Sequence, residues 1–435
     1  MSSTTIELAP GCRTQEEALD IVSQAAASLF IHGQTTERVI AAAEQLGTAL
    51  GMSVHVLPHW GELVVEIDGA PRAEIVPATP LGVDMGRVLA VMNVVDRVSD
   101  GTLPPAAARA ALAATDRVPP ASTPRFVTFC AIAASALGVI FGAFDPASLL
   151  LIAASAGLGA LVRRGLARLA GNPFIQPLCA AAIAGIIAAL AARWGLTNAP
   201  SLVAFCPCMV LVPGPHILNG AIDLARTRVA LGADRLTYAG MIVLMICSGV
   251  LAGLAVSGGV LAAGPSPPVP LLADVVAAGC AVAGFGTFFS MPWRMLPFPI
   301  AVGMLAHAAR WALISLAGAN VAAGALVACL LAGVIVAPVV DRLRLPFAAV
   351  AFSAVVSMMP GFFLFHAASA LSSLVLLAPG PSAELVTNGV ANGATAFMIV
   401  LAMTFGLILP RMLFVRFLPA PAPRGQRPAR RNLSH

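Results

Sequence analysis

Three polar residues follow a Pro-Gly pair inside a long apolar stretch and have the chemistry to bind a small polar molecule. His216, Asn219 and Asp223 lie three and then four residues apart, after Pro213-Gly214. In a helix this spacing places them on one face. Histidine changes its charge near neutral pH, and a carboxylate in a membrane helix is costly unless it meets a partner or water. We therefore expect a polar site here, with His216 or Asp223 able to carry a proton.

A second Pro-Gly pair, Pro360-Gly361, interrupts another apolar stretch, about half of the apolar region further along the chain. A helix that breaks at membrane depth leaves backbone groups without partners. Lipid tolerates this only where the break is buried in protein or lines a water-filled cavity. Two breaks in corresponding positions of two halves indicate the binding site of a transporter. The sequence therefore predicts one shared cavity at the middle of the membrane, with His366 as a further proton carrier.

The ends of broken helices suit a zwitterion such as an amino acid. Each break presents carbonyl groups from one half-helix and amide groups from the next, with opposite partial charges. The carboxylate of an amino acid would suit residues 216–219 or 362–365, and its ammonium group would suit the carbonyls. The predicted substrate-binding residues are Pro213, Gly214, His216, Asn219, Asp223, Ser357, Pro360, Gly361, His366 and Asn392.

Each of these residues also has a structural interpretation. Asp223 lies toward the end of its apolar stretch, where it would pair with Arg226, and the two prolines would only kink packed helices. Small polar residues such as Asn392 hydrogen-bond between membrane helices without any substrate. His307, with Arg310 one turn further along, is a third candidate histidine, for which packing is the competing interpretation.

The composition is that of a membrane protein. Hydrophobic residues make up 59% and charged residues 10% of the chain, with a mean hydropathy of +0.90, whereas soluble domains carry about 25% charged residues. The net charge of +5 comes from arginines in short loops and a tail, which suits a membrane surface and argues against nucleic acid as a partner. No cofactor or metal is expected. Cys206-Pro207-Cys208 would suit a soft metal, but no second thiol motif accompanies it.

Ten apolar stretches are predicted to span the membrane. They lie near 126–144, 147–162, 174–192, 200–222, 239–260, 271–290, 296–316, 319–339, 346–377 and 389–417. Five spans in each half is an odd number, so the two halves must cross the membrane in opposite directions. The predicted fold is an α-helical polytopic membrane protein of about ten transmembrane helices, arranged as a 5+5 inverted repeat.

A polar segment precedes the spans and is predicted to form a cytosolic α+β domain. Its predicted helices cover 16–30, 35–50, 84–99 and 105–116, and its predicted strands cover 53–57, 62–67 and 75–76. The predicted organisation is an N-terminal tail (1–13), the cytosolic α+β domain (14–118), a linker (119–125), membrane repeat one (126–260), an outer loop (261–270), membrane repeat two (271–417) and a disordered basic tail (418–435).

The arginines of the loops predict the orientation in the membrane. Nearly all of them fall on the side of the N-terminal segment, and the opposite loops hold almost none. Because positive charge collects on the inner face, this side is predicted to be the cytoplasm. We expect a multi-pass protein of the bacterial cytoplasmic (inner) membrane with both termini inside. Its expected partners are the lipid bilayer, a small amino acid and protons, and association into a homo-oligomer is left open.

The order of these elements resembles one family. His32, Gly33, Thr36, Arg38, Leu46, Gly47 and Gly51 form a His-Gly…Thr-x-Arg…Leu-Gly…Gly pattern. The fourth span then contains Leu-Val-Pro-Gly followed by Asn and Asp-Leu. A second block carries Phe-Phe-Ser-Met-Pro-Trp-Arg (288–294) and the second Pro-Gly pair. From residue 14 to 417 the chain resembles the threonine/serine exporter family, in a fused form that carries both halves.

The resemblance implies secondary active export of threonine, serine or a similar small amino acid from the cytoplasm, in exchange for protons. Related two-part systems are associated with dicarboxylate export, so a succinate-like substrate is the alternative. A channel and a membrane-anchored hydrolase are the competing classes. A hydrolase would use His32, His55, His59 and Glu62 of the N-terminal domain, whose spacing matches no hydrolytic motif. The chain is therefore not expected to be an enzyme.

Overall fold

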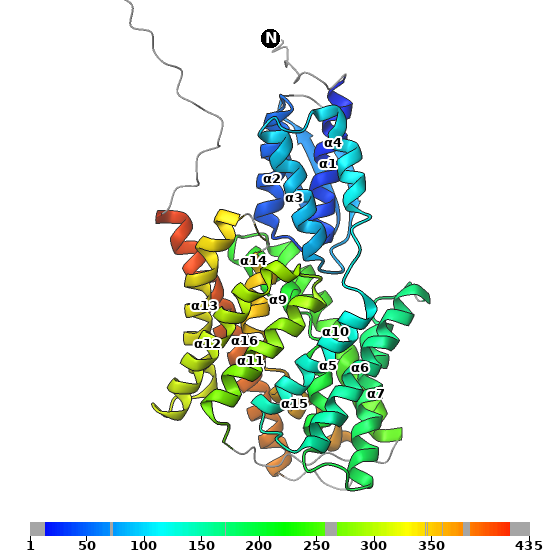
Figure 1. Ribbon diagram of the computed structural model, residues 1–435, viewed down its shortest axis with the longest axis vertical. Coiled ribbons are helices and arrows are strands. Elements are labelled where there is room, and N and C mark those ends of the chain that lie inside the picture. Colours follow the sequence, from blue (N-terminus) through cyan, green and yellow to red (C-terminus); the bar gives the residue numbers. More distant parts are fainter. Residues whose placement is uncertain are drawn as a thin grey trace, which may run out of the picture.

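The computed structural model describes residues 14–69, 73–169, 171–256, 268–343, 345, 347–358, 360–376 and 383–417. The predicted N-terminal tail, most of the predicted outer loop and the C-terminal tail lie outside these residues. Within them the chain is mostly helical, with one small antiparallel sheet near the N-terminus (Figure 1).

Residues 14–118, called the N-terminal unit below, surround an apolar core of their own. The elements are α1 (Gln15–Ile31), α2 (Thr36–Ala49), β1 (Val54–His59), β2 (Gly61–Ile67), β3 (Ala73–Ala78), α3 (Met85–Ser99) and α4 (Pro105–Thr115). The first helix begins where the Thr14 hydroxyl accepts a hydrogen bond from the Glu17 amide at 3.2 Å, which caps the helix. All four predicted helices are confirmed. The predicted hairpin is also present, but its turn is shorter than expected because His59 still pairs with Glu62.

In the described residues, eight helices are long and apolar enough to cross a membrane. They are α5 (Thr123–Ile140), α6 (Pro146–Leu169), α7 (Ile175–Arg193), α10 (Val229–Val256), α11 (Leu271–Phe288), α12 (Pro297–Ser315), α13 (Val321–Leu343) and α16 (Ala383–Phe417). A short 3-10 turn, Trp293–Met295, precedes α12. These helices overlap eight of the predicted spans, but α6 ends seven residues later and α10 begins ten residues earlier than predicted.

Two further spans are bent at the predicted breaks. The first consists of α8 (Pro200–Met209) and α9 (Gly214–Ala225), which meet at a bend of 55°. The second consists of α14 (Phe347–Val355), a 3-10 turn (Val356–Met358) and α15 (Gly361–Leu376), with a bend of 60°. Counting each bent pair as one span gives up to ten in the described part of the chain, as predicted.

The two bent spans cross each other at their breaks. Phe205 of α8 stacks on Phe365 of α15, with 5.5 Å between ring centroids. At the start of α9, Gly214 lies against the ring of Phe352 from α14. The first half of each bent span therefore packs on the second half of the other. Figure 1 shows α9 and α14 on the side of the N-terminal unit and α15 toward the opposite end.

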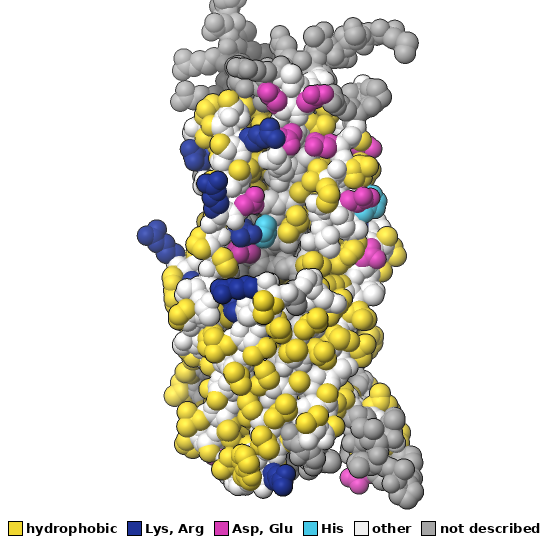
Figure 2. Space-filling view, turned by 90° about the vertical axis from the view of Figure 1, so that its right-hand side faces the viewer, with side chains coloured by type: hydrophobic (Ala, Val, Ile, Leu, Met, Phe, Trp, Pro, Cys, Tyr) yellow, Lys and Arg dark blue, Asp and Glu magenta, His cyan; other side chains and the backbone are white. Residues whose placement is uncertain are grey.

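The surface divides into two regions along the long axis. Charged side chains gather over the N-terminal unit and its junction with the helix bundle (Figure 2). The surface of the bundle below this junction is mostly hydrophobic, with single charges at its far end. Large exposed apolar side chains there include Leu150, Leu244 and Phe405. A contiguous apolar band of this kind is what the hydrocarbon core of a bilayer covers.

Candidate functional site

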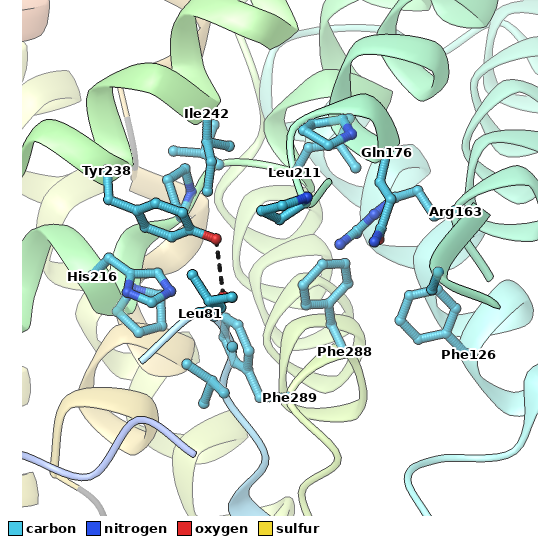
Figure 3. Close-up of a pocket in the computed structure, with 18 of the residues that line it drawn as sticks. Leu81, Phe126, Arg163, Gln176, Leu211, His216, Tyr238, Ile242, Phe288 and Phe289 are labelled. Atoms are coloured by element: carbon cyan, nitrogen blue, oxygen red, sulfur yellow. Dashed lines mark hydrogen bonds between the residues drawn. The ribbon is translucent and has the colours of Figure 1, made fainter. Parts of the chain in front are cut away.

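A cavity of about 580 Å³ lies beside the first break, where the helix bundle meets the N-terminal unit (Figure 3). Its walls come from α5, α6, α7, the segment between α8 and α9, α10, the end of α11 and the loop before α3. Its lining residues include Leu81, Phe126, Arg163, Gln176, Leu211, Pro213, Pro215, His216, Tyr238, Ile242, Phe288 and Phe289. This volume falls in the range that holds a small metabolite.

Arg163 of α6 gives the cavity a cation. Its guanidinium lies 4.7 Å from the centre of the Phe288 ring. Its Nε and Nη1 atoms are buried and have no hydrogen-bond partner among the described residues. Free N–H donors on a buried guanidinium are suited to binding a carboxylate with two hydrogen bonds. The predicted span 147–162 left Arg163 in a loop, which is wrong, because α6 continues to Leu169 and carries Arg163 into the cavity wall.

His216 and Tyr238 form the wall opposite Arg163. The two rings meet edge to face, with 5.1 Å between their centroids. The Tyr238 hydroxyl donates a hydrogen bond to the carbonyl of Leu81 at 3.2 Å, which joins α10 to the N-terminal unit (Figure 3). Sequence reasoning missed Tyr238 and Gln176. A signal for Tyr238 was available, since it is the only tyrosine of the chain and interrupts an apolar helix.

Asn219 and Asp223 lie on the predicted face but contact the N-terminal unit. The Asn219 side-chain amide donates to the carbonyl of Gly33 at 3.3 Å. The Thr36 hydroxyl donates to Asp223 Oδ2 at 3.0 Å. Neither residue lines the cavity described above. The structure thus places these two residues of the predicted site in the junction between α2 and α9.

The ion pairs of Asp223 differ from the pairing expected of it. Its Oδ2 lies 3.1 Å from Arg235 Nε, and its Oδ1 lies 3.4 Å from Arg228 Nη1. Arg226, the expected partner, instead contacts Glu37 of α2 at 2.7 Å. The α9 helix ends at Ala225, so the chain turns and brings the following helix back along Asp223. The predicted span 239–260 left Arg235 in a loop, but Arg235 lies in α10 and is fully buried.

The residues of the second break do not line this cavity. Pro360 and Gly361 are buried, and Gly361 lies against Met209 at the end of α8. The expectation of one cavity shared by both breaks is therefore wrong for the cavity seen here. The breaks touch each other through side chains, and the described lining of this cavity includes residues of the first break but not of the second.

The polar residues near the second break are distributed differently. Ser357 contacts His307 of α12, with 2.6 Å between Oγ and Nε2. His366 is packed between the rings of Phe205 and Phe362, and its Nε2 has no hydrogen-bond partner among the described residues. Asn392 bonds within its own helix, donating to the carbonyl of Asn388 at 2.8 Å. Asn392 is thus not brought to the cavity.

The four polar residues considered for a hydrolase do not form one cluster, although His59 and Glu62 are register partners on β1 and β2. His55 and His59 lie on β1, opposite Glu66 and Glu62 in the register. His32 Nδ1 lies 2.7 Å from the Ser28 carbonyl, and its Nε2 lies 3.1 Å from Arg87 Nη1. Burial lowers the pKa of His32, the hydrogen bond to Ser28 opposes this, and the charge of Arg87 lowers the pKa further.

Metal ligands do not cluster in the described residues, where no group of three or more His, Cys, Asp and Glu side chains could hold an ion. Cys206 and Cys208 are both buried in α8 and carry free thiols. Their surroundings are apolar, as in an ordinary packed helix.

Comparison with known proteins identifies two matching blocks. A family model described as a threonine/serine exporter matches residues 20–257, and a second threonine/serine exporter model matches residues 274–413. Neither the curated proteins nor the solved structures give a match. The first block ends after α10 and the second begins within α11, so the two models divide the chain between its two bent spans. With the first model alone covering more than half of its length, this chain belongs to the threonine/serine exporter family.

Proposed function

We propose that this protein exports threonine, serine or a similar small amino acid from the cytoplasm by proton antiport, and that the cavity beside the first break binds the substrate. The observation that carries the proposal is the Arg163 side chain, which lines this cavity and whose buried Nε and Nη1 atoms have no hydrogen-bond partner among the described residues. A cation without a partner is costly in an apolar setting, and a substrate carboxylate would remove that cost.

The other walls of the cavity suit the remaining groups of a hydroxylated amino acid. Gln176, His216 and Tyr238 offer side-chain hydrogen bonds to a hydroxyl group. The substrate ammonium group would meet carbonyls at the end of α8, where Val212 and Pro213 line the cavity and the regular helix has stopped. The site thus has a cation, a set of polar groups and backbone acceptors for the three polar parts of threonine.

Proton coupling is assigned to histidine within this proposal. Asp223 is held by Arg228, Arg235 and Thr36, which favours a structural role as an ionised carboxylate. His216 lines the cavity itself, so protonation of its ring and binding of the substrate ammonium group would oppose each other. His366, with its free Nε2, is the second candidate.

The proposal includes an arrangement in the membrane. The N-terminal unit lies in the cytoplasm, the protein spans the bacterial inner membrane with both ends inside, and the two halves form an inverted 5+5 repeat. The crossing of the bent spans supports the repeat, since each half contributes one broken helix to the same contact. Alternating access would then rock one half against the other about this crossing. Assembly into a homo-oligomer would leave this mechanism unchanged.

A dicarboxylate is the second candidate substrate. It would need two cationic partners, and among the described residues that line the cavity Arg163 is the only arginine. The cavity therefore favours an amino acid, whose second charge is positive. Competition separates the two substrates, because excess unlabelled serine should suppress threonine exchange while succinate should leave it unchanged.

The test is threonine counterflow in proteoliposomes with the full chain. The Arg163→Gln variant should lower exchange by about tenfold or more, because a charge-assisted hydrogen bond contributes about 1.5–3 kcal/mol. Arg168→Gln is the matched control, since Arg168 lies on the same helix and is exposed. Wild-type exchange rates in Arg163→Gln would remove the cavity from the mechanism, and absence of threonine exchange in the wild type would refute the proposed substrate.

A further inference from the structure

Asp274, His307 and Ser357 form a buried chain of two hydrogen bonds inside the second half of the bundle. Asp274 Oδ2 lies 2.8 Å from His307 Nδ1, and His307 Nε2 lies 2.6 Å from Ser357 Oγ. The three residues come from α11, α12 and the 3-10 turn before the second break. All three are buried, and His307 is 0% exposed. Such a chain in an apolar bundle needs an explanation beyond packing, because each polar group costs free energy there.

We propose that Asp274, His307 and Ser357 form a proton-binding site beside the second break, in which His307 Nε2 takes up and releases the proton. The proposal rests on the proton antiport proposed above. Its ligand is the proton alone, and its position is distinct from the cavity that holds Arg163.

The three residues connect the far end of the bundle with the second break. Asp274 is in the first turn of α11, which starts at the far end of the bundle and ends at Phe288, next to the N-terminal unit. Ser357 lies three residues before Pro360, deep in the second bent span. The hydrogen-bond chain therefore leads from near the far surface inward to the break. Ser357 lies in the segment that must move when the second bent span changes its bend angle. A change in the hydrogen bonding of Ser357 therefore acts on this segment.

The geometry also defines the protonation step. An ionised carboxylate only accepts hydrogen bonds, so His307 donates Nδ1–H to Asp274, and its Nε2 accepts from the Ser357 hydroxyl. When a proton binds at Nε2, the hydroxyl must turn and accept instead. The charge of the Asp274–His307 pair then changes from −1 to 0, and no covalent bond is made or broken. Release of the proton from Nε2 restores the first arrangement.

The charges around His307 are compatible with this cycle. Arg310, one turn further along α12, interacts with Asp274, and its Nε has no hydrogen-bond partner among the described residues. From α13, Cys329 lies near Arg310, whereas Asp341 and Arg342 are at the other end of that helix. The described part of α14 contributes no titratable side chain, and Arg294 of the 3-10 turn lies before α12. Arg310 therefore supplies the counter-charge when the pair is negative.

The same three residue types in this order also form the triad of serine hydrolases. A hydrolase needs access of a substrate to the serine, and Ser357 is 2% exposed and does not line the cavity beside the first break. A fluorophosphonate probe tests this directly. Covalent labelling of Ser357 in the wild type, absent in Ser357→Ala, would overturn the assignment to proton binding.

The decisive experiment separates exchange from coupling in proteoliposomes that contain a pH-sensitive dye. In His307→Gln, threonine counterflow without a pH gradient should stay close to the wild-type rate, since exchange moves no net proton. Substrate-driven proton flux should fall by about a hundredfold or more, the usual contribution of a positioned proton-transfer group. Asp274→Asn keeps the side-chain shape and should likewise retain counterflow but lose proton flux. It provides the test if His307→Gln does not fold.

Ser353→Ala is the matched control, because Ser353 is buried one turn earlier in the same bent span and, among the described residues, its hydroxyl bonds only to the Ala349 carbonyl of its own helix. The Ser353→Ala variant should retain both threonine counterflow and substrate-driven proton flux. Wild-type proton flux in His307→Gln and Asp274→Asn would overturn the proposal. So would loss of counterflow together with proton flux in a folded variant, which would indicate a structural role. Absence of coupling in the wild type would instead refute the antiport proposed above.

Discussion

Two arginines of the bundle illustrate how a membrane helix holds a charge. Arg235 is fully buried, and Asp223, the Thr36 hydroxyl and the ring of Phe30 surround its guanidinium. Arg163 has only the aromatic contact to Phe288 and two nitrogen atoms without partners among the described residues. Arg235 Nε and Nη1 also lack a hydrogen-bond partner among the described residues, but the Asp223 carboxylate, 3.1 Å from Nε, balances the charge of this arginine. Arg163 is the one that indicates a ligand, and for this reason it carries the proposed function.

His32 makes stability depend on pH outside the membrane. Burial lowers its pKa below the ordinary value of 6.5. As the pH falls below 6.5, the unfolded state binds a proton that the folded state binds less readily, so stability is lost in that window. The melting temperature of the wild type should therefore fall more between about pH 7.5 and pH 5.5 than that of His32→Gln.

The control for His32 is His55→Gln, because the side chain of His55 is 65% exposed on β1. This variant should keep the pH dependence of the wild type. Scanning fluorimetry in detergent measures all three proteins. Equal pH dependence in the wild type and His32→Gln would show that burial of this imidazole has no thermodynamic consequence.

At the scale of elements, the crossing of the two bent spans requires glycine at Gly214. A Cβ atom at this position would overlap the ring of Phe352 from α14. We expect Gly214→Ala to cost about 1–3 kcal/mol or more, because the packed ring cannot move freely. Gly240→Ala is the control, since nothing lies within 4 Å of a Cβ there and alanine favours a helix.

A double variant tests whether the cost arises from this one contact. Gly214→Ala combined with Phe352→Ala should be more stable than the sum of the two single effects predicts, by about 0.5–3 kcal/mol. Thermal unfolding in detergent gives the comparison. Strictly additive effects would mean that α9 and α14 do not press on each other at the break.

The elements were largely predictable from the sequence, and the contacts between them were not. Pro213 and Pro360 marked both breaks, because proline and glycine disrupt a helix whatever its neighbours are. Asp223 shows what the sequence could not predict. Its spacing from His216 placed it correctly on one face, but its partners are Thr36 of α2 and Arg235 of α10. Such long-range partners follow from the packing of whole elements and leave no periodic signal.

For the candidate site, the sequence predicted the residues of only one wall of the cavity. His216 and Pro213 do line the cavity, as predicted from their position after the break. Arg163 belongs to another helix, and its pairing with Arg164 in the sequence suggested a charged loop. The neighbouring Arg164 points elsewhere and donates to the carbonyl of Ala121. Consecutive residues of a helix face different directions. Which of the two arginines faces the cavity depends on how far α6 extends, and the structure shows that it extends to Leu169.

At the scale of the whole molecule, the N-terminal unit is joined to the bundle by polar contacts from both halves. Arg38 of α2 bonds to Asp341 at the end of α13 at 2.6 Å, and Thr36 bonds to Asp223 of α9. The family pattern His-Gly…Thr-x-Arg thus supplies the contact surface of the N-terminal unit. This explains why the pattern begins at the end of α1, where Gly33 also accepts a bond from Asn219.

The junction should depend strongly on Asp223. Asp223→Asn leaves the buried Arg235 without a counter-charge and should cost about 3–5 kcal/mol. Asp234→Asn is the control on the neighbouring helix, since Asp234 is exposed. Adding Arg235→Gln to Asp223→Asn should recover part of the loss. No change in melting temperature for Asp223→Asn would mean that the N-terminal unit is held by other contacts.

The most direct test of the proposed function is a cryo-electron microscopy map of the full chain with threonine bound. The cavity between α6, α10 and the first break should then contain density for one threonine, with its carboxylate within about 3 Å of the Arg163 guanidinium. Density for threonine at another place, with the cavity beside Arg163 unchanged from the threonine-free protein, would contradict the account.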